Sequence, residues 1–104
     1  MNVTVKNVFS QASAAGEGFL TLLENSGIKI ERIVSHSHAS PEDFWYDQDG
    51  DEWVMILRGS ATLEFAGGEL VEMGAGDCLT IPARLRHRVA RTSAETIWLA
   101  VHVK

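Results

Sequence analysis

Cysteine is nearly absent from this 104-residue sequence, and no long hydrophobic run occurs in it. The single cysteine, Cys78, cannot form a disulfide within the chain, which favours a reducing compartment. Because Cys78 lies in the apolar run DCLTIP, we expect a buried structural thiol rather than a nucleophile. No apolar run approaches the roughly 20 residues that span a bilayer, and residues 1–16 lack the basic-then-apolar layout of a secretory signal. We therefore expect a cytoplasmic protein.

Basic residues are also scarce. The sequence has 9 Lys and Arg against 14 Asp and Glu, a net charge of −5, which argues against nucleic acid or an anionic membrane as the main partner. With 45% hydrophobic and 22% charged residues, the composition is that of an ordinary globular protein. The length predicts one domain, residues 1–104, with one core.

Short β-type segments, in contrast, are abundant, and turn residues separate them at Asn25–Gly27, Gly67–Gly68 and Gly74–Asp77. The segment Ser10–Leu23 carries two glycines and no sustained helical period, so it is predicted to be a loop that runs into a strand. Eight or nine strands are expected, at residues 2–9, 18–27, 28–36, 52–59, 60–68, 69–77, 78–83, 87–91 and 96–103. Many short strands imply an all-β sandwich or closed barrel, here with N-terminal strands and loop at 1–25 and the barrel at 26–104.

Two histidines follow the clearest alternating segment. In residues 28–36, Ile30, Arg32 and Val34 share one face, and that face continues to His36 and His38. Two imidazoles on one strand face could share an ion. Taken alone, this pair could equally well be two polar residues of a serine-rich loop.

Further along the chain, Glu52 begins an apolar strand that ends at Gly59, and Gly76 is followed by Pro82 and His87. With His36 and His38, these residues resemble the two sequence motifs of the cupin superfamily, G-x5-H-x-H-x3-4-E-x6-G and G-x5-P-x-G-x2-H-x3-N. The motifs lie at residues 36–59 and 76–91. The resemblance implies a cupin-type double-stranded β-helix, or jelly-roll barrel, whose mouth holds one divalent metal ion through His36, His38, Glu52 and His87.

The sequence departs from these motifs in specific ways. Thirteen residues separate His38 from Glu52, where the family usually has three or four. This long insertion could move His38, or let Asp47, Asp49 or Asp51 replace Glu52 as the carboxylate ligand. In addition, a residue other than the motif's own stands at three positions, which are Ile30, Arg84 and Arg91.

Three imidazoles and a carboxylate suit Mn, Fe, Co, Ni, Cu or Zn better than Ca or Mg, and they leave two positions open on a six-coordinate ion. Four further residues could supply acid, base or anchoring groups: Tyr46, Arg84, Arg86 and His102. Alternatives remain open for each. Phe44, Trp45 and Tyr46 could form a pocket wall or a lid, or Phe44 and Trp45 could cover an exposed sheet face or fill a dimer contact. The arginines could balance the acidic loop, and His102 could be a core or pocket residue.

The first function hypothesis is a metal-dependent enzyme, dioxygenase- or isomerase-like, that acts on a small oxygen-rich molecule. The second is a non-catalytic sensor or binding module, and the third is a metal that only stabilises the fold. A barrel that has lost its metal and keeps its histidines in a polar pocket is also open. Because residues 53–57 are apolar on both sides, we expect a homodimer.

Overall fold

The computed structural model describes residues 2–10 and 16–104 and contains eight strands. They are β1 (Gly16–Glu24), β2 (Ile28–His36), β3 (Glu52–Arg58), β4 (Ser60–Phe65), β5 (Leu70–Gly74), β6 (Cys78–Ile81), β7 (His87–Thr92) and β8 (Thr96–Val103). The strand predicted at residues 2–9 is wrong, because this segment forms no strand with any part of the chain that the structure describes and leaves Val3 and Val5 73% and 93% exposed. Residues 1 and 11–15, part of the predicted N-terminal loop, lie outside the described residues.

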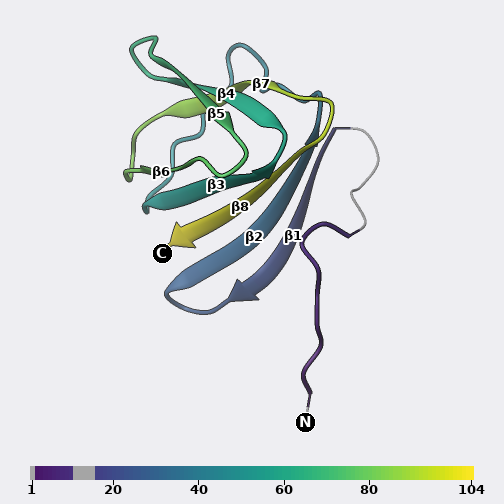
Figure 1. The fold of residues 1–104 in the computed structure, drawn as a ribbon. Helices are drawn as coiled ribbons and strands as arrows, with labels where there is room; N and C mark the ends of the chain where they lie inside the picture. Colours follow the sequence, from purple (N-terminus) through teal and green to yellow (C-terminus); the bar gives the residue numbers. More distant parts are fainter. Residues whose placement is uncertain (1, 11–15) are drawn as a thin grey trace.

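The strands form two antiparallel sheets, which confirms the all-β jelly roll (Figure 1). The larger sheet has the order β1-β2-β8-β3-β6, and the smaller has the order β5-β4-β7. Both β2 and β3 pair with the last strand, β8, so the C-terminal strand lies in the middle of the larger sheet. In the described part of the chain, no helix is long and apolar enough to cross a membrane.

Alternation gives the larger sheet an inner and an outer face. On β3, Val54 and Ile56 are buried in the core, while Met55 between them is only partly buried and faces outward. On β2, Ile33 packs against the same core, so Val34 belongs to the outer face. Since Val54 and Ile56 face the core and Met55 faces outward, β3 has apolar side chains on both faces, as the sequence predicts.

Gly59, the last residue of the first motif, makes the β3–β4 turn possible. Its φ of +84° is in the left-handed region, and a Cβ there would lie 2.3 Å from the carbonyl oxygen of Glu95. Any larger residue would therefore be strained and would also collide with backbone. The turn sends β4 into the second sheet, where Leu63 and Phe65 complete the core.

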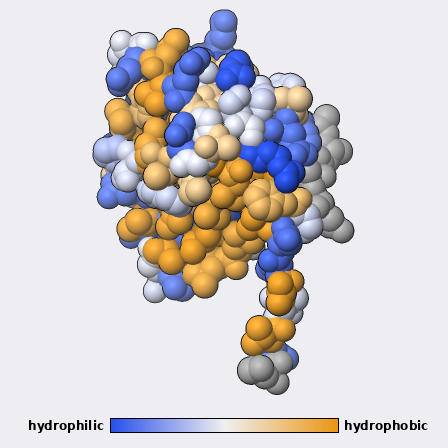
Figure 2. Space-filling view, in the orientation of Figure 1, coloured by the Kyte–Doolittle hydropathy of each residue, from blue (hydrophilic) through white to orange (hydrophobic). Residues whose placement is uncertain are grey.

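The outer face of the larger sheet is apolar and partly exposed. Figure 2 shows a continuous hydrophobic area where Figure 1 has β8, β2 and β1. Part of the N-terminal segment crosses this face, since Arg32 donates to the carbonyl oxygens of Val8 and Ser10.

Cys78 lies on the edge strand β6, where it pairs with Met55 of β3. Its side chain is exposed, so the prediction of a buried thiol is wrong. The run around Cys78 alternates, and only Leu79 and Ile81 face the core.

Candidate functional site

A cavity of about 90 Å³ opens between the two sheets, and strands from both contribute to its wall. Its apolar wall includes Phe19, Ile33 and Trp98. Its polar lining comes from six elements or loops far apart in sequence and consists of Glu17, Glu31, Tyr46, Gln48, Glu52, His87 and His102. A small apolar pocket with a few convergent polar groups is the usual form of a ligand site.

The first carboxylate–imidazole pair joins β2 to β8. Glu31 shares the inner face of β2 with Ile33, and on β8 alternation brings His102 to the same face as Trp98. The Nε2 atom of His102 lies 2.8 Å from Oε1 of Glu31, a hydrogen-bond distance. Glu31 is only 6% exposed, so this contact keeps a buried carboxylate satisfied.

The second pair joins β3 to β7. Glu52 begins β3, His87 begins β7, and Nε2 of His87 lies 3.6 Å from Oε1 of Glu52. The other oxygen of Glu52 lies 3.9 Å from Nε2 of His102, so Glu52 lies between the two imidazoles. Both distances exceed hydrogen-bond length. Glu52 is 6% exposed, and its carboxylate contacts both imidazoles through these long ion pairs.

His87 is the titratable group most clearly affected by this arrangement. Burial opposes its positive charge, but the contacts with Glu52 and with the carbonyl oxygen of Leu85 outweigh burial and raise the pKa of His87 above its usual value of 6.5. The Nδ1 atom of His87 lies 3.0 Å from that carbonyl oxygen, which fixes the ring and directs Nε2 toward the cavity. His87 can therefore hold a proton next to Glu52.

The long insertion between His38 and Glu52 brings Tyr46 to the cavity. Tyr46 forms an antiparallel bridge with His87, with N–H···O distances of 2.7 and 3.1 Å, and their rings stack 5.5 Å apart. Burial raises the pKa of Tyr46 to about 12, with further contributions from Glu17, Glu52 and Glu31. Its phenol is therefore neutral at physiological pH and can donate a hydrogen bond into the cavity.

The acidic tip of the insertion binds the β6–β7 loop. Asp47 and Asp49 form ion pairs with Arg84 at 3.1 and 2.8 Å, and Asp51 accepts a hydrogen bond from the backbone N–H of Ala83. None of these three aspartates lines the cavity, whereas Glu52 does. Arg84 stands at the second motif's glycine and has a left-handed φ of +67°, the conformation a glycine adopts freely.

Neither predicted arginine faces the cavity. Arg84 is occupied by the two aspartates, and the guanidinium of Arg86 lies 5.5 Å from the ring of Trp45. The contacts of Arg84 match the alternative in which the arginines balance the acidic loop, whereas Arg86 contacts an aromatic residue of that loop. Of the other predicted candidates, Tyr46 and His102 do line the cavity.

The shared face predicted for His36 and His38 is wrong. Strand β2 ends at His36, and Ser37 adopts a left-handed φ of +48°, which breaks the two-residue alternation. His36 continues the outer face of β2, and its buried Nε2 has no hydrogen-bond partner among the described residues. The local sequence HSHAS carries no signal for this change of direction.

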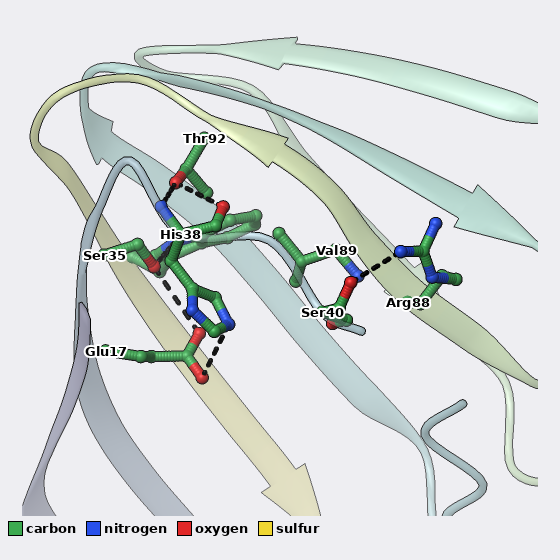
Figure 3. Close-up of polar contacts among 8 residues, drawn as sticks. Glu17, Ser35, His38, Ser40, Arg88, Val89 and Thr92 are labelled. Atoms are coloured by element: carbon green, nitrogen blue, oxygen red, sulfur yellow. Dashed lines mark hydrogen bonds and ion pairs between the residues drawn. The ribbon is translucent and has the colours of Figure 1, made fainter. Parts of the chain in front are cut away.

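His38 turns to Glu17 instead, as Figure 3 shows. Its Nε2 lies 3.6 Å from Oε1 of Glu17, and its backbone N–H donates to Oγ1 of Thr92 at 2.7 Å. Glu17 also accepts a long hydrogen bond from Ser35, whose hydroxyl accepts from the indole of Trp98. Burial raises the pKa of Glu17 despite the opposing effects of His38 and Ser35.

The four predicted metal ligands therefore do not converge on one point. Glu52 and His87 lie together at the cavity, His38 is nearest to Glu17, and His36 is on the outer face. Throughout residues 2–10 and 16–104, no group of three His, Cys, Asp or Glu side chains is arranged so that it could hold a metal ion. The predicted ligand set does not fit a single metal in this arrangement, and metal binding stays a prediction.

Sequence reasoning missed two carboxylates of the cavity, Glu17 and Glu31. Glu31 lies on the strand face opposite to Ile30 and Arg32. The face of Ile30 carries more apolar residues, so the sequence indicated that it was the interior face. Glu17 lies in the stretch predicted to be a loop. One signal was available in the sequence. Glu31 shares its strand face with Ile33, and a large apolar residue on that face indicates that the face is not simply exposed to solvent.

Comparison with known proteins agrees with this architecture. Residues 33–102 match the family model for the cupin domain. A structure from Ralstonia eutropha JMP134, provisionally named a mannose-6-phosphate isomerase, is 47% identical, with a TM-score of 0.91 over 98% of this chain and 99% of that one. A search of curated proteins gave no match.

More distant structures share the fold. A cupin superfamily protein from Desulfitobacterium hafniense DCB-2 is 17% identical, with a TM-score of 0.77 over 89% of this chain and 82% of that one. A Streptococcus pyogenes protein of unknown function is 20% identical, with a TM-score of 0.79 over 100% of this chain and 90% of that one.

Proposed function

The chain belongs to the cupin family, and from this premise we propose that it binds a small oxygen-rich molecule in the cavity and transfers protons on it, as an isomerase does. One observation carries the proposal: two carboxylate–imidazole pairs, Glu52–His87 and Glu31–His102, border the same small cavity. The name of the 47% identical Ralstonia protein supports isomerase chemistry. Pairs of titratable groups in different environments are the usual equipment for moving a proton between two atoms.

The chemistry fits a hydroxy-carbonyl compound. The carboxylate of Glu52 would take a proton from the carbon next to the carbonyl, while His87, whose pKa is raised, would donate its proton to the carbonyl oxygen. The resulting enediol would regain a proton on the neighbouring carbon and lose one from oxygen, which completes the isomerisation. Tyr46, held neutral, would hydrogen-bond a substrate oxygen and orient it.

The experiment is proton exchange in heavy water. Purified protein is incubated with glyceraldehyde or dihydroxyacetone in D2O, and deuterium at the carbon next to the carbonyl is followed by NMR. We expect exchange above the buffer rate, and a loss of about 100-fold or more in the Glu52→Gln variant, because general acid–base groups contribute on that scale. Glu69→Gln, in the exposed β4–β5 turn, is the matched control and should exchange like the wild type.

A second candidate is a non-catalytic binding module, and the partly exposed apolar face of the larger sheet favours it because such a face suits a protein partner. In that case a ligand binds in the cavity without deuterium exchange. The test uses a panel of aldoses, ketoses and hydroxy acids. If at least one compound binds and none of them exchanges deuterium, the binding module is supported over the isomerase.

The remaining expectations stay predictions. A cytoplasmic location and a homodimer were inferred from sequence, and the outer face offers the surface that a homodimer would use. The metal ion was inferred from four residues that do not converge, so no step of the proposed reaction passes through a metal.

A further inference from the structure

The charge of the cavity lining identifies the class of ligand. Among the fourteen residues that line the cavity, three are glutamates, two are histidines and none is lysine or arginine. Even with both histidines protonated, this lining keeps a net negative charge. We propose that the ligand of the cavity is a small amino alcohol, a molecule that carries an ammonium group beside its hydroxyl groups, rather than a phosphorylated sugar. The inference goes beyond the proposed function, because an amino alcohol has no carbonyl group to isomerise; it names a second class of ligand for the same cavity.

Glu52 supplies an observation independent of the overall charge. It is 6% exposed, lines the cavity, and lies 3.6 and 3.9 Å from the two nearest imidazoles, too far for a hydrogen bond. Because these two contacts are long ion pairs, part of the hydrogen-bonding capacity of the Glu52 carboxylate is directed at the cavity. A ligand ammonium group supplies up to three N–H donors and a positive charge, which would satisfy Glu52.

The nearby cations are not available to an anionic ligand. Arg84 is bound by Asp47 and Asp49, and Arg86 lies over the ring of Trp45. Lys29 lies 3.6 Å from Glu31 but does not line the cavity. A phosphate group would therefore meet carboxylates with no guanidinium or ammonium partner from the lining, and its desolvation would go unrepaid.

The remaining walls suit the other parts of an amino alcohol. Tyr46 stays neutral and can donate to or accept from a hydroxyl group, and Gln48 offers an amide beside it. The rings of Tyr46 and Trp98 give aromatic surface to a cation and to a short carbon chain. The cavity of about 90 Å³ limits the ligand to a few carbon atoms.

Three probes with one carbon skeleton test the proposal. Serinol, glycerol and glycerol 2-phosphate differ only at the central carbon, which carries an ammonium, a hydroxyl and a phosphate group. Each is titrated into ¹⁵N-labelled, chelator-treated protein at one fixed pH. The indole N–H signal of Trp98, which lines the cavity, reports binding, and the indole signals of Trp45 and Trp53 are internal references.

We expect serinol to bind at least about tenfold more tightly than glycerol, because a hydrogen bond to a charged group contributes about 1.5–3 kcal/mol. Glycerol 2-phosphate should leave the Trp98 signal unchanged. In Glu52→Gln the preference for serinol over glycerol should disappear, while Glu69→Gln should keep it. If Glu52→Gln fails to fold, Glu17→Gln is the second variant, and it should reduce the preference for serinol over glycerol.

Each contrary result has a definite meaning. Equal binding of glycerol and serinol, or tighter binding of glycerol 2-phosphate, would overturn the amino alcohol while the proposed function stands. Displacement of serinol by Mn²⁺ or Zn²⁺, with the metal affinity lost in Glu52→Gln, would reassign the carboxylates as metal ligands. Absence of binding by all three probes, together with deuterium exchange on a neutral hydroxy-carbonyl, would also overturn this inference alone.

Discussion

The two faces of the larger sheet use the same strands for opposite purposes. The inner face is apolar over Val54, Ile56 and Trp98 but ends in the glutamates and histidines of the cavity. The outer face is apolar where it is partly exposed, as Figure 2 shows. The inner face therefore combines an apolar core with a cluster of buried charged groups, whereas the outer face is mostly apolar although part of it is exposed. The comparison teaches that alternation divides one sheet into a face that forms the core and the cavity and a face that stays partly exposed.

The largest expected effect separates the two faces at neighbouring residues. Ile56→Ala on the inner face, where the side chain is fully buried, should lower the free energy of unfolding by about 2–5 kcal/mol. Met55→Ala on the outer face should cost clearly less, because Met55 is only partly buried. Urea denaturation measures both, and equal losses would contradict the difference between the faces.

The outer face itself is tested by charge. If the proposed homodimer forms there, Leu99→Glu, a partly buried position on β8, should convert a dimer into a monomer of 11.4 kDa. A buried unpaired charge in an apolar contact costs more than most dimers can absorb. Light scattering after size exclusion gives the mass, and circular dichroism checks the fold. A wild-type monomer would rule out the dimer.

Across the cavity from the inner face, His87 on β7 of the smaller sheet makes stability depend on pH. Its folded-state pKa is raised, so the folded protein binds this proton more tightly than the unfolded chain. The stabilisation is fully present below the unfolded value of 6.5 and is lost as the pH rises through the folded pKa. We therefore expect His87→Gln to cost more stability at pH 5.5 than at pH 8.5. NMR titration should show the pKa of His87 falling in Glu52→Gln.

A smaller effect of opposite sign is expected at Glu17. Burial raises its pKa, so its charged form is less favourable in the folded protein than in the unfolded chain. Stability is lost as the pH rises from the unfolded to the folded pKa, and Glu17→Gln should recover it. Because solvent screens part of the penalty, we expect a gain below about 1 kcal/mol at neutral pH. An unchanged or lower melting temperature would show that contacts with His38 and Ser35 outweigh burial.

The smallest expected effect is that of metal removal. Because His36, His38, Glu52 and His87 do not converge, dialysis against a chelator should leave the melting temperature within about 2 °C of its starting value. Metal analysis of the purified protein accompanies the melt. A large drop, with a stoichiometric ion before dialysis, would support the metal site predicted from the sequence motifs.

The sequence by itself determined the strand pattern, the all-β fold and several parts of the site. Alternation and turn residues marked all eight strands, because both depend on neighbouring residues. Glu52 and His87 were identified because they stand at motif positions, and the cavity contains both. Gly59 was identified in the same way, and its left-handed turn explains why the motif requires it.

Only the tertiary structure decided which groups meet. The reversed backbone at Ser37 separates His36 from His38, and its cause is packing against β7 and the β7–β8 turn, where Ser37 donates to the carbonyl oxygen of Ser93. Glu17 and Glu31 join the site through pairing of β1, β2 and β8, contacts between segments up to 71 residues apart. The direction of a strand face depends on which neighbours cover it, and an alternating pattern gives the period of a strand without saying which side is the interior.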